Sequence, residues 1–542
     1  MKQFKKIICI LLVLAAVLML AACGSDGSGA TLQYPIDADP ECLDPQIAEG
    51  AEAKTVVLNC FEGLVRHSSD GSIVPGVAES WSYNPSTLTY TFKLREDSRW
   101  VIMKKAFTPI LGEGFAETFD NRVTASDFVF ALHRAVSPST AAPEALTLAS
   151  IKNAKAIISG KKSVSELGVK AVGDFTLEIT LETAVDEHSF LSLLTKSICM
   201  PCNEEFFNAT KGRYGLNYST LMCNGPFYLS YWLEDSSLTL KNNDDYTGQS
   251  AAKPASVTLV IDDDYSERLE LLLDGSYCAA QLGTVEPNSD DFTVTKSYDT
   301  VWALCFNCSS TTLSNVSLRR ALCTAVDYDS LSLESSDMQK TYSVIPPSCF
   351  VGEGFDLNSE AVKILGYDVK KSAAYWQNAS EKLGGTVKIE VLCLPEHENA
   401  MRRMIQGWQR ITGLSASFSV TVLEREELDE RVESGDYQVA LTSLTAGVTS
   451  AADYLNSLTS GGSRNIFAYK NSSFDSSVKN LKALDGAQLV KACRNAEGKL
   501  LTDAAVLPLF VTPSYFALGE DVSGISVDSE TSAVDFVFAL AD

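Results

Sequence analysis

The chain has 542 residues, of which 45% are hydrophobic and 9% aromatic, and its formal net charge at pH 7 is −25. This acidic excess excludes a nucleic-acid partner, because contacts to phosphate need clustered lysine and arginine. A small ligand remains compatible, since it needs only one local pocket. A chain of this length can bury several hydrophobic cores, so we expect two or three lobes.

Residues 1–22 are typical of a secretion signal. Three lysines precede an almost continuously apolar run from residue 7 to residue 22, which is shorter than the roughly 20 residues of a membrane span. The sequence Leu20-Ala21-Ala22-Cys23 matches the bacterial lipoprotein box. It predicts cleavage before Cys23, a diacylglycerol on its sulfur, and a lipidated flexible tether over residues 23–30. The alternative is an ordinary signal peptide with a cysteine nearby.

Cleavage would remove three lysines and no acidic residue, taking the formal charge from −25 to about −28. No later segment is apolar enough to span a bilayer, so the lipid on Cys23 is the expected membrane attachment. The expected location is the outer face of the bacterial cytoplasmic membrane, or its periplasmic face where an outer membrane is present.

Strands and helices alternate along the rest of the chain. A strand is expected over 31–36, followed by a helix from about Ala53 to the segment 59–66. Apolar residues alternate with polar ones in 87–94 and again in 175–182, which predicts strands with one buried face. Thr124 and Asp127 resemble a helix cap, and apolar residues then follow at helical spacing until Ser137-Pro138.

The second half repeats this alternation and predicts α/β lobes. Helical spacing recurs over 318–326 and 401–408, and a strand pattern follows over 418–422. Two seams, near 298–306 and near 507–511, frame a middle section. We therefore expect one lobe to be inserted into another, with a hinge formed by two crossing strands.

Twelve cysteines remain after Cys9 and Cys23 are set aside. Two pairs, Cys199/Cys202 and Cys305/Cys308, have the two-residue gap of a zinc ribbon or a redox dithiol, but the long interval between the pairs is unlike a zinc ribbon. Because many cysteines lie within apolar runs, we favour free buried thiols over a local disulfide and both over structural zinc.

Catalytic motifs are largely missing. The sequence lacks the Gly-x-Ser-x-Gly elbow, the phosphate-binding loop and the His-Glu-x-x-His zinc motif. Ser476 to Lys479 fits Ser-x-x-Lys without its partner motifs, and the four histidines are scattered. We expect no enzyme activity, no cofactor and no metal.

An ordered series of motifs covers nearly the whole chain. It comprises Leu43-Asp44-Pro45, Phe61-Glu62-Gly63-Leu64-Val65, Val74 to Trp81, Thr89 to Arg95, Val123 to Val129, Asn224-Gly225-Pro226-Phe227, Ser317 to Leu322, Ala452-Asp453-Tyr454 and Leu507-Pro508-Leu509. In this series the chain resembles the family 5 extracellular solute-binding proteins of ABC importers, which include oligopeptide-, dipeptide- and nickel-binding lipoproteins.

The resemblance implies an α/β, two-lobed fold of the type II periplasmic-binding-protein kind, with an extra domain on the first lobe and a two-strand hinge. The expected first lobe comprises 31–66, 170–297 and 506–542. The extra domain is expected over 67–169, and the inserted second lobe over 298–505.

The resemblance also implies site residues. Asp453, in the Ala-Asp-Tyr motif with Tyr454, would receive the amino terminus of a peptide ligand, since a buried ammonium needs a carboxylate partner. The alternative for Asp453 is an ordinary helix-capping role. The backbone of Glu49, Gly50 and Ala51 would pair with an extended ligand. Asn224 is a further candidate.

Two departures from the family pattern concern charge. Gly447 stands where some relatives have an arginine, which puts recognition of a free peptide carboxylate in doubt. Glu144 stands where relatives often have an aromatic residue. If Glu144 faces the ligand, it and Asp453 would favour a cationic one.

The expected function is that of a monomeric, lipid-anchored receptor that captures a small solute, most favourably a short peptide, and delivers it to ABC permease subunits. The alternatives are a ligand-sensing receptor or chaperone on the same fold and, less favoured, an envelope hydrolase.

Overall fold

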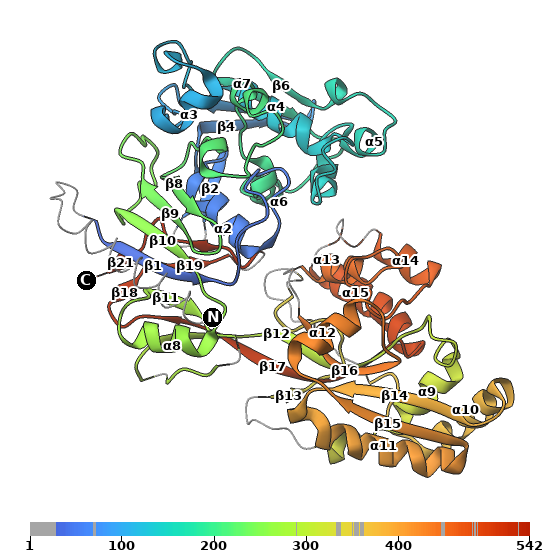
Figure 1. Ribbon diagram of the computed structural model, residues 1–542. Coiled ribbons are helices and arrows are strands. Elements are labelled where there is room, and N and C mark those ends of the chain that lie inside the picture. Colours follow the sequence, from blue (N-terminus) through green and yellow to red (C-terminus); the bar gives the residue numbers. More distant parts are fainter. Residues whose placement is uncertain are drawn as a thin grey trace. The chain divides into compact units, whose positions relative to one another are not determined.

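The computed structural model describes residues 29–68, 72–283, 285–288, 290–331, 338–349, 351, 357, 363–445, 450–479, 481, 484, 486–528 and 531–541. The chain divides into two compact units (Figure 1). Unit 1 comprises Met1–Leu282, Pro287–Val294 and Phe516–Asp542, and unit 2 comprises Gly283–Glu286 and Thr295–Tyr515. The lipobox, with Cys23, and Gly447 lie outside the described residues.

One four-stranded sheet of unit 1 has the order β1-β10-β9-β8. Its strands are β1 (Thr31–Ile36), β8 (Phe227–Leu233), β9 (Ser237–Asn242) and β10 (Ser256–Ile261). β1 pairs with β10 in parallel, and the other two pairings are antiparallel. Alternate residues of β1, namely Leu32, Tyr34 and Ile36, are buried, as a strand with one covered face requires. Helix α2 (Gly50–Cys60) packs against β8.

A second sheet of unit 1 is antiparallel throughout, with the order β4-β5-β7-β6. Its strands are β4 (Ala78–Asn84), β5 (Thr89–Leu94), β6 (Val169–Ala171) and β7 (Thr176–Thr180). The strand alternation read from 87–94 and 175–182 is confirmed, since Phe92 and Leu177 face the core. Helix α4 (Ala125–Val136) packs on β6 and β7 and begins with the Thr124–Asp127 capping box.

The remaining elements of unit 1 are short. They are β2 (Val65–His67), β3 (Ile73–Pro75), α3 (Lys104–Leu111), α5 (Ala154–Ile158), α6 (Glu187–Leu193), α7 (Glu204–Ala209), α8 (Tyr265–Leu273), β11 (Ala279–Gln281), β18 (Val522–Ser523), β19 (Ser526–Val527), β20 (Val534–Asp535) and β21 (Leu540–Ala541), with 3₁₀ helices η1 (Phe115–Glu117), η2 (Ala145–Ser150), η3 (Val164–Glu166), η4 (Ser197–Cys199) and η5 (Tyr218–Thr220).

The end of the chain packs onto α2. The side-chain amide of Asn59 donates to the carbonyl of Val534 at 2.7 Å, and its oxygen accepts from the N–H of Phe536 at 2.9 Å. Asp535 forms an ion pair with Arg66 at 3.4 Å. Residues from the two ends of the sequence therefore complete one core.

Unit 2 is organised on a seven-stranded sheet with the path β11-β17-β12-β16-β14-β15, to which β13 is added by pairing with β17. Its strands are β12 (Thr293–Phe306), β13 (Gln339–Lys340), β14 (Val387–Cys393), β15 (Ala416–Val422), β16 (Val439–Thr445) and β17 (Val506–Leu518). β14 is parallel to β15 and β16, and β12 is antiparallel to β16. β11 pairs with Phe516 to Leu518 at the end of β17, and both of these segments belong to unit 1.

Helices cover this sheet. They are α9 (Val316–Thr324), α10 (Val369–Leu383), α11 (Glu398–Thr412), α12 (Arg425–Glu433), α13 (Ala451–Ser457), α14 (Ser472–Val478) and α15 (Gly486–Thr502), with short 3₁₀ helices η6 (Tyr328–Ser330), η8 (Pro395–His397) and η9 (Gly413–Ser415). The helical spacing read from 401–408 is confirmed, because Met401, Met404 and Trp408 lie on the buried face of α11, which packs against β15.

β12 and β17 each have residues in both units. Unit 2 ends at Tyr515, ten positions beyond the expected lobe end at residue 505, because β17 continues as one strand through the second seam. The expected extra domain over 67–169 is not separated from unit 1 by this division and stays a prediction.

Twelve cysteines among the described residues have free thiols, and ten of these are buried. Burial raises the pKa of the Cys199 and Cys202 thiols to about 12, so both stay protonated at neutral pH. Protonated thiols are poor nucleophiles and poor metal ligands. In the part of the chain that the structure describes, no cluster of histidine, cysteine and carboxylate could hold a metal ion, and no helix is long and apolar enough to cross a membrane.

Candidate functional site

The predicted ligand-pairing segment, Glu49 to Ala51, opens α2 in unit 1. The loop before it is anchored by buried charges. Arg134, on α4, forms an ion pair with Asp44 and donates to Gln46 Oε1 at 2.6 Å. Gln46 in turn donates to the carbonyl of Met200 at 3.0 Å. These contacts fix the position of the loop from which α2 begins.

The backbone of this segment is available to a ligand. Glu49 is extended, with φ −121° and ψ 160°, and its side chain does not cap the helix. Glu49 and Gly50 are both exposed. Gly50 has φ +79°, a left-handed conformation that glycine adopts without strain and that few other residues tolerate. β-type pairing with a peptide needs an extended, exposed backbone, which Glu49 alone has in this segment, because Gly50 is left-handed and Ala51 lies in α2. Ligand pairing by residues 49–51 therefore stays a prediction.

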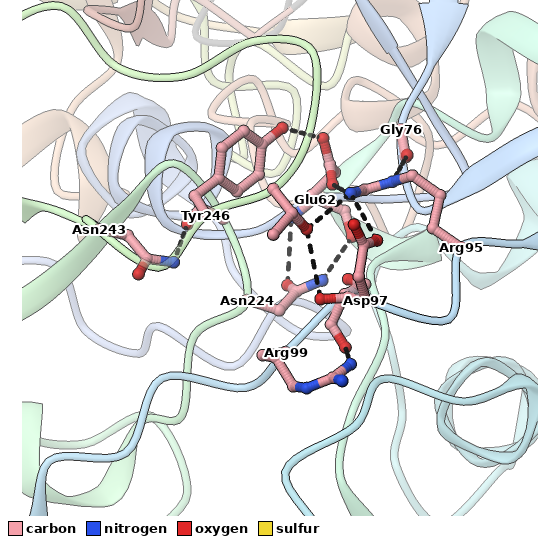
Figure 2. Close-up of polar contacts among 11 residues, drawn as sticks. Glu62, Gly76, Arg95, Asp97, Arg99, Asn224, Asn243 and Tyr246 are labelled. Carbon is pink, nitrogen blue, oxygen red and sulfur yellow. Dashed lines mark hydrogen bonds and ion pairs between the residues drawn. The ribbon is translucent and has the colours of Figure 1, made fainter.

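The side chain of Asn224 forms hydrogen bonds with the protein backbone (Figure 2). Its side-chain amide donates to the carbonyl of Glu62 at 2.9 Å, and its oxygen accepts from the N–H of Glu62 at 3.1 Å. The residue is only 1% exposed, which leaves almost no accessible surface for a ligand. The geometry therefore supports a role in holding the segment after α2, and contact between Asn224 and a ligand stays a prediction.

Glu62 is the centre of a buried polar network that sequence reasoning missed. Its carboxylate accepts from Arg95 at 2.8 Å and from the hydroxyl of Tyr246, and Arg95 also donates to the carbonyl of Gly76 at 3.0 Å (Figure 2). Burial raises the pKa of Glu62 although Arg66 and Arg95 oppose that rise. The network ties the end of α2 to β5 and to the loop after β9.

Glu144 is paired within unit 1. Its carboxylate forms an ion pair with Lys54, on α2, and the exposed fractions of the two side chains are 31% and 15%. The expected negative charge at this position is therefore compensated by a neighbouring ammonium. This pairing weakens the expectation that Glu144 selects a cationic ligand.

In unit 2, Asp453 and Tyr454 lie in the first turn of α13 but on different faces. Ser450 caps this helix by accepting from the N–H of Ala452 at 3.2 Å. Asp453 is half-buried, whereas Tyr454 is 1% exposed. The Tyr454 hydroxyl has no hydrogen-bond partner among the described residues. Tyr454 thus packs in the core of unit 2, and Asp453 is the member of the pair with accessible surface.

Polar groups gather at the end of β16, from which the chain leads to α13. The carbonyl of Thr445 accepts from Arg464 at 2.6 Å. The Thr445 hydroxyl lies 3.3 Å from that of Thr300, which donates to Asp299 at 3.0 Å. Sequence reasoning did not single out Arg464 or Asp299, because no motif marks them and three separate strands and loops bring them together.

Burial raises the pKa of the Cys349 thiol, and the smaller electrostatic contributions include those of Asp299, Arg464 and Asp453. The predicted site residues form two sets, one in each unit, with Glu49, Gly50, Ala51, Asn224 and Glu144 in unit 1 and Asp453 and Tyr454 in unit 2.

Residues 72–465 match the family model for the middle region of bacterial extracellular solute-binding proteins, family 5. This match spans well over half of the chain, so the protein belongs to this family of extracellular solute-binding proteins. The family consists of solute-binding proteins.

Individual relatives match nearly the whole length. The chain is 24% identical over 546 residues to the oligopeptide-binding protein OppA of Bacillus subtilis, covering 95% of each chain. It is 26% identical over 528 residues to the probable deoxycholate-binding periplasmic protein YgiS of Escherichia coli, covering 94% of this chain and 92% of the relative.

Solved structures confirm the two-lobed fold class. The substrate-binding domain of an oligopeptide ABC transporter from Bacillus anthracis superposes with a TM-score of 0.71 and 25% identity, covering 95% of this chain and 99% of that one. Peptide-bound OppA of Listeria monocytogenes gives the same TM-score at 23% identity and the same coverage.

Proposed function

We propose that this protein captures a short extracellular peptide and delivers it to the permease of an ABC importer, while a lipid on Cys23 holds it at the membrane. The observation that carries the proposal is the family match over residues 72–465, together with relatives named as oligopeptide-binding proteins along nearly their whole length. The accessible backbone at Glu49 and Gly50 and the half-buried carboxylate of Asp453 supply the two kinds of group that peptide capture needs.

The backbone of residues 49–51 and the carboxylate of Asp453 would contribute to peptide binding in different ways. Backbone pairing at 49–51 contributes affinity that is indifferent to the ligand's side chains. Asp453 accepts the terminal ammonium, and a charge-assisted hydrogen bond of this kind is about twice as strong as a neutral one. No reaction takes place on the chain. The peptide shifts the protein towards the state that binds it more tightly, and the permease recognises that state.

A second candidate ligand is an amphipathic carboxylate such as a bile acid. The specific observation in its favour is the match to the relative from Escherichia coli that is named as probably deoxycholate-binding. Such a ligand would have no ammonium for Asp453. Its binding would therefore be insensitive to loss of that carboxylate, which separates the two candidates.

The test is a thermal-shift and calorimetric screen of the chain from Gly24 onward against pools of di- to hexapeptides, with nickel chelates, oligosaccharides and deoxycholate as other arms. A ligand present at about 100 times its Kd stabilises the folded state by about 2.7 kcal/mol, which a thermal shift detects. We expect stabilisation by peptides. A folded protein that responds to none of the peptide pools would contradict the proposal.

A further inference from the structure

The ion pair between Lys54 and Glu144 joins two segments that are far apart in the sequence. Lys54 lies four positions after Gly50 on α2, so it shares a face of the helix with the start of the proposed ligand-pairing segment. The side chain of Lys54 is 15% exposed and that of Glu144 is 31% exposed. Both charges are partly desolvated, and both retain a surface that a bound molecule could approach.

Glu144 is held in place by its own backbone. Its carbonyl accepts from the N–H of Thr147 at 2.9 Å and from the Thr147 hydroxyl at 2.8 Å, at the start of η2. Ala145 and Leu148 anchor this short helix in the core. Because the backbone is fixed, loss of Lys54 would leave the carboxylate near α2.

Lys54 is the cation that contacts the Glu144 carboxylate in this ion pair. Burial raises the pKa of the Cys199 thiol, on which the opposing charges of Lys196 and Glu144 also act. Without Lys54, a carboxylate in a partly desolvated setting would attract a cation, because screening by water is weakened there.

We propose that Lys54 is a specificity-determining residue that acts as an internal counter-ion for Glu144. Because the charges of Lys54 and Glu144 cancel, this part of the proposed site is neutral. The protein therefore accepts ligand side chains without selecting cationic ones. The inference rests on the proposed peptide-binding function, since it names a determinant of side-chain preference in that same site. It also reverses the expectation that Glu144 by itself favours a cationic ligand.

The test compares the mature wild-type protein with Lys54→Met by calorimetry at low salt. The probes are tetrapeptides that carry one lysine, or one acetyl-lysine of similar shape and no charge, at each position in turn. We expect the wild type to bind both kinds equally. We expect Lys54→Met to prefer lysine at one position by about two- to fivefold, within the range for a partly exposed ion pair. The preference should fall as salt is added.

Two further variants keep the result interpretable. Lys54→Met combined with Glu144→Gln should lose the preference again, because the carboxylate is gone. Glu144→Gln alone leaves Lys54 unpaired and should favour glutamate over glutamine in the corresponding peptides. The matched control is Lys104→Met, which breaks the exposed 3.1 Å pair with Glu117 on η1 and should change nothing.

The outcomes separate the two proposals. Peptide binding by a folded Lys54→Met variant with no lysine preference at any position would overturn the role of Lys54 and leave peptide capture standing. A wild type that already prefers lysine at the position affected by Lys54→Met would overturn it as well. A wild type that binds no peptide would remove peptide capture and the counter-ion role together.

Discussion

Asp453 lies on the half-buried face of α13, while Ala452 and Leu455 carry the opposite face into the core of unit 2. A residue in this position can lose its charge without leaving a cavity. It is therefore suited to a test that separates ligand recognition from folding. The neighbouring Tyr454 offers no such test, because its ring is buried and its removal would destabilise unit 2.

We expect Asp453→Asn to weaken binding of peptides with a free amino terminus by at least about thirtyfold, because removing one partner of a hydrogen-bonded charge pair costs roughly 2–5 kcal/mol. Amino-acetylated peptides should bind the variant and the wild type equally. Calorimetry measures both. The control is Asp436→Asn, at an exposed side chain of unit 2 whose ion pair with Arg431 is 3.5 Å long. Equal affinity of wild type and Asp453→Asn for free peptides would remove the assignment.

The residues of the site could be predicted only where a local motif marks them. The Ala-Asp-Tyr motif marks Asp453 as a candidate, but it gives no sign that the tyrosine faces inward. Lys54 and Glu144 are separated by 90 positions, and Glu62 and Tyr246 by 184. No periodicity connects residues so far apart, so these pairs emerge only from the fold.

At the level of single elements, α4 carries a titratable group in its cap. Asp127 accepts from the N–H of Thr124 at 2.7 Å and from its hydroxyl at 3.1 Å. These hydrogen bonds lower the pKa of Asp127, but burial outweighs them and raises it from 3.8 to about 6. The folded state therefore binds this proton more tightly than the unfolded state does.

A raised carboxyl pKa stabilises the protein at low pH. This contribution is fully present below pH 3.8 and is lost as the pH rises through about 6. We expect Asp127→Asn to remove it, so that the difference in unfolding free energy between wild type and variant changes by up to about 3 kcal/mol between pH 4 and pH 7. Urea unfolding at several pH values measures this difference. Parallel pH profiles for the two proteins would show that Asp127 titrates normally.

Some helices and strands can be predicted from their sequence patterns better than others. The cap and spacing of α4 and the alternation in β5 identify both elements, because each has one buried face. β12 extends over 14 residues, of which the first eight are exposed or half-buried and only the last six are buried. This change in burial within one strand is what the sequence pattern registers as a seam near 298–306.

At the scale of the whole molecule, a receptor that is cleaved before Cys23 but carries no lipid would have a charge near −28 and would diffuse away from a cell that lacks an outer membrane. A lipid on Cys23 would keep captured ligand close to the permease. Cys23→Ala should abolish lipidation, and the substitution precedes every described helix and strand of the chain in the sequence.

We expect purified Cys23→Ala protein to bind peptide with unchanged affinity by calorimetry, while uptake of labelled peptide by cells that carry it falls. Restoring a different membrane anchor should restore uptake. Loss of peptide binding in vitro would show that Cys23 does more than tether the protein.

Because residues 534–536 pack onto α2, the core around this helix can form only after these residues have been synthesised. The amide of Asn59 finds its partners in residues 534 and 536, which lie 475 and 477 positions further along the sequence. Until they arrive, the core around α2 is incomplete and a buried amide lacks its hydrogen bonds, a cost of roughly 1–3 kcal/mol. The residues of unit 2 all precede Phe516–Asp542 in the sequence. The core of unit 1 around α2 can therefore be completed only after the whole of unit 2 has been synthesised.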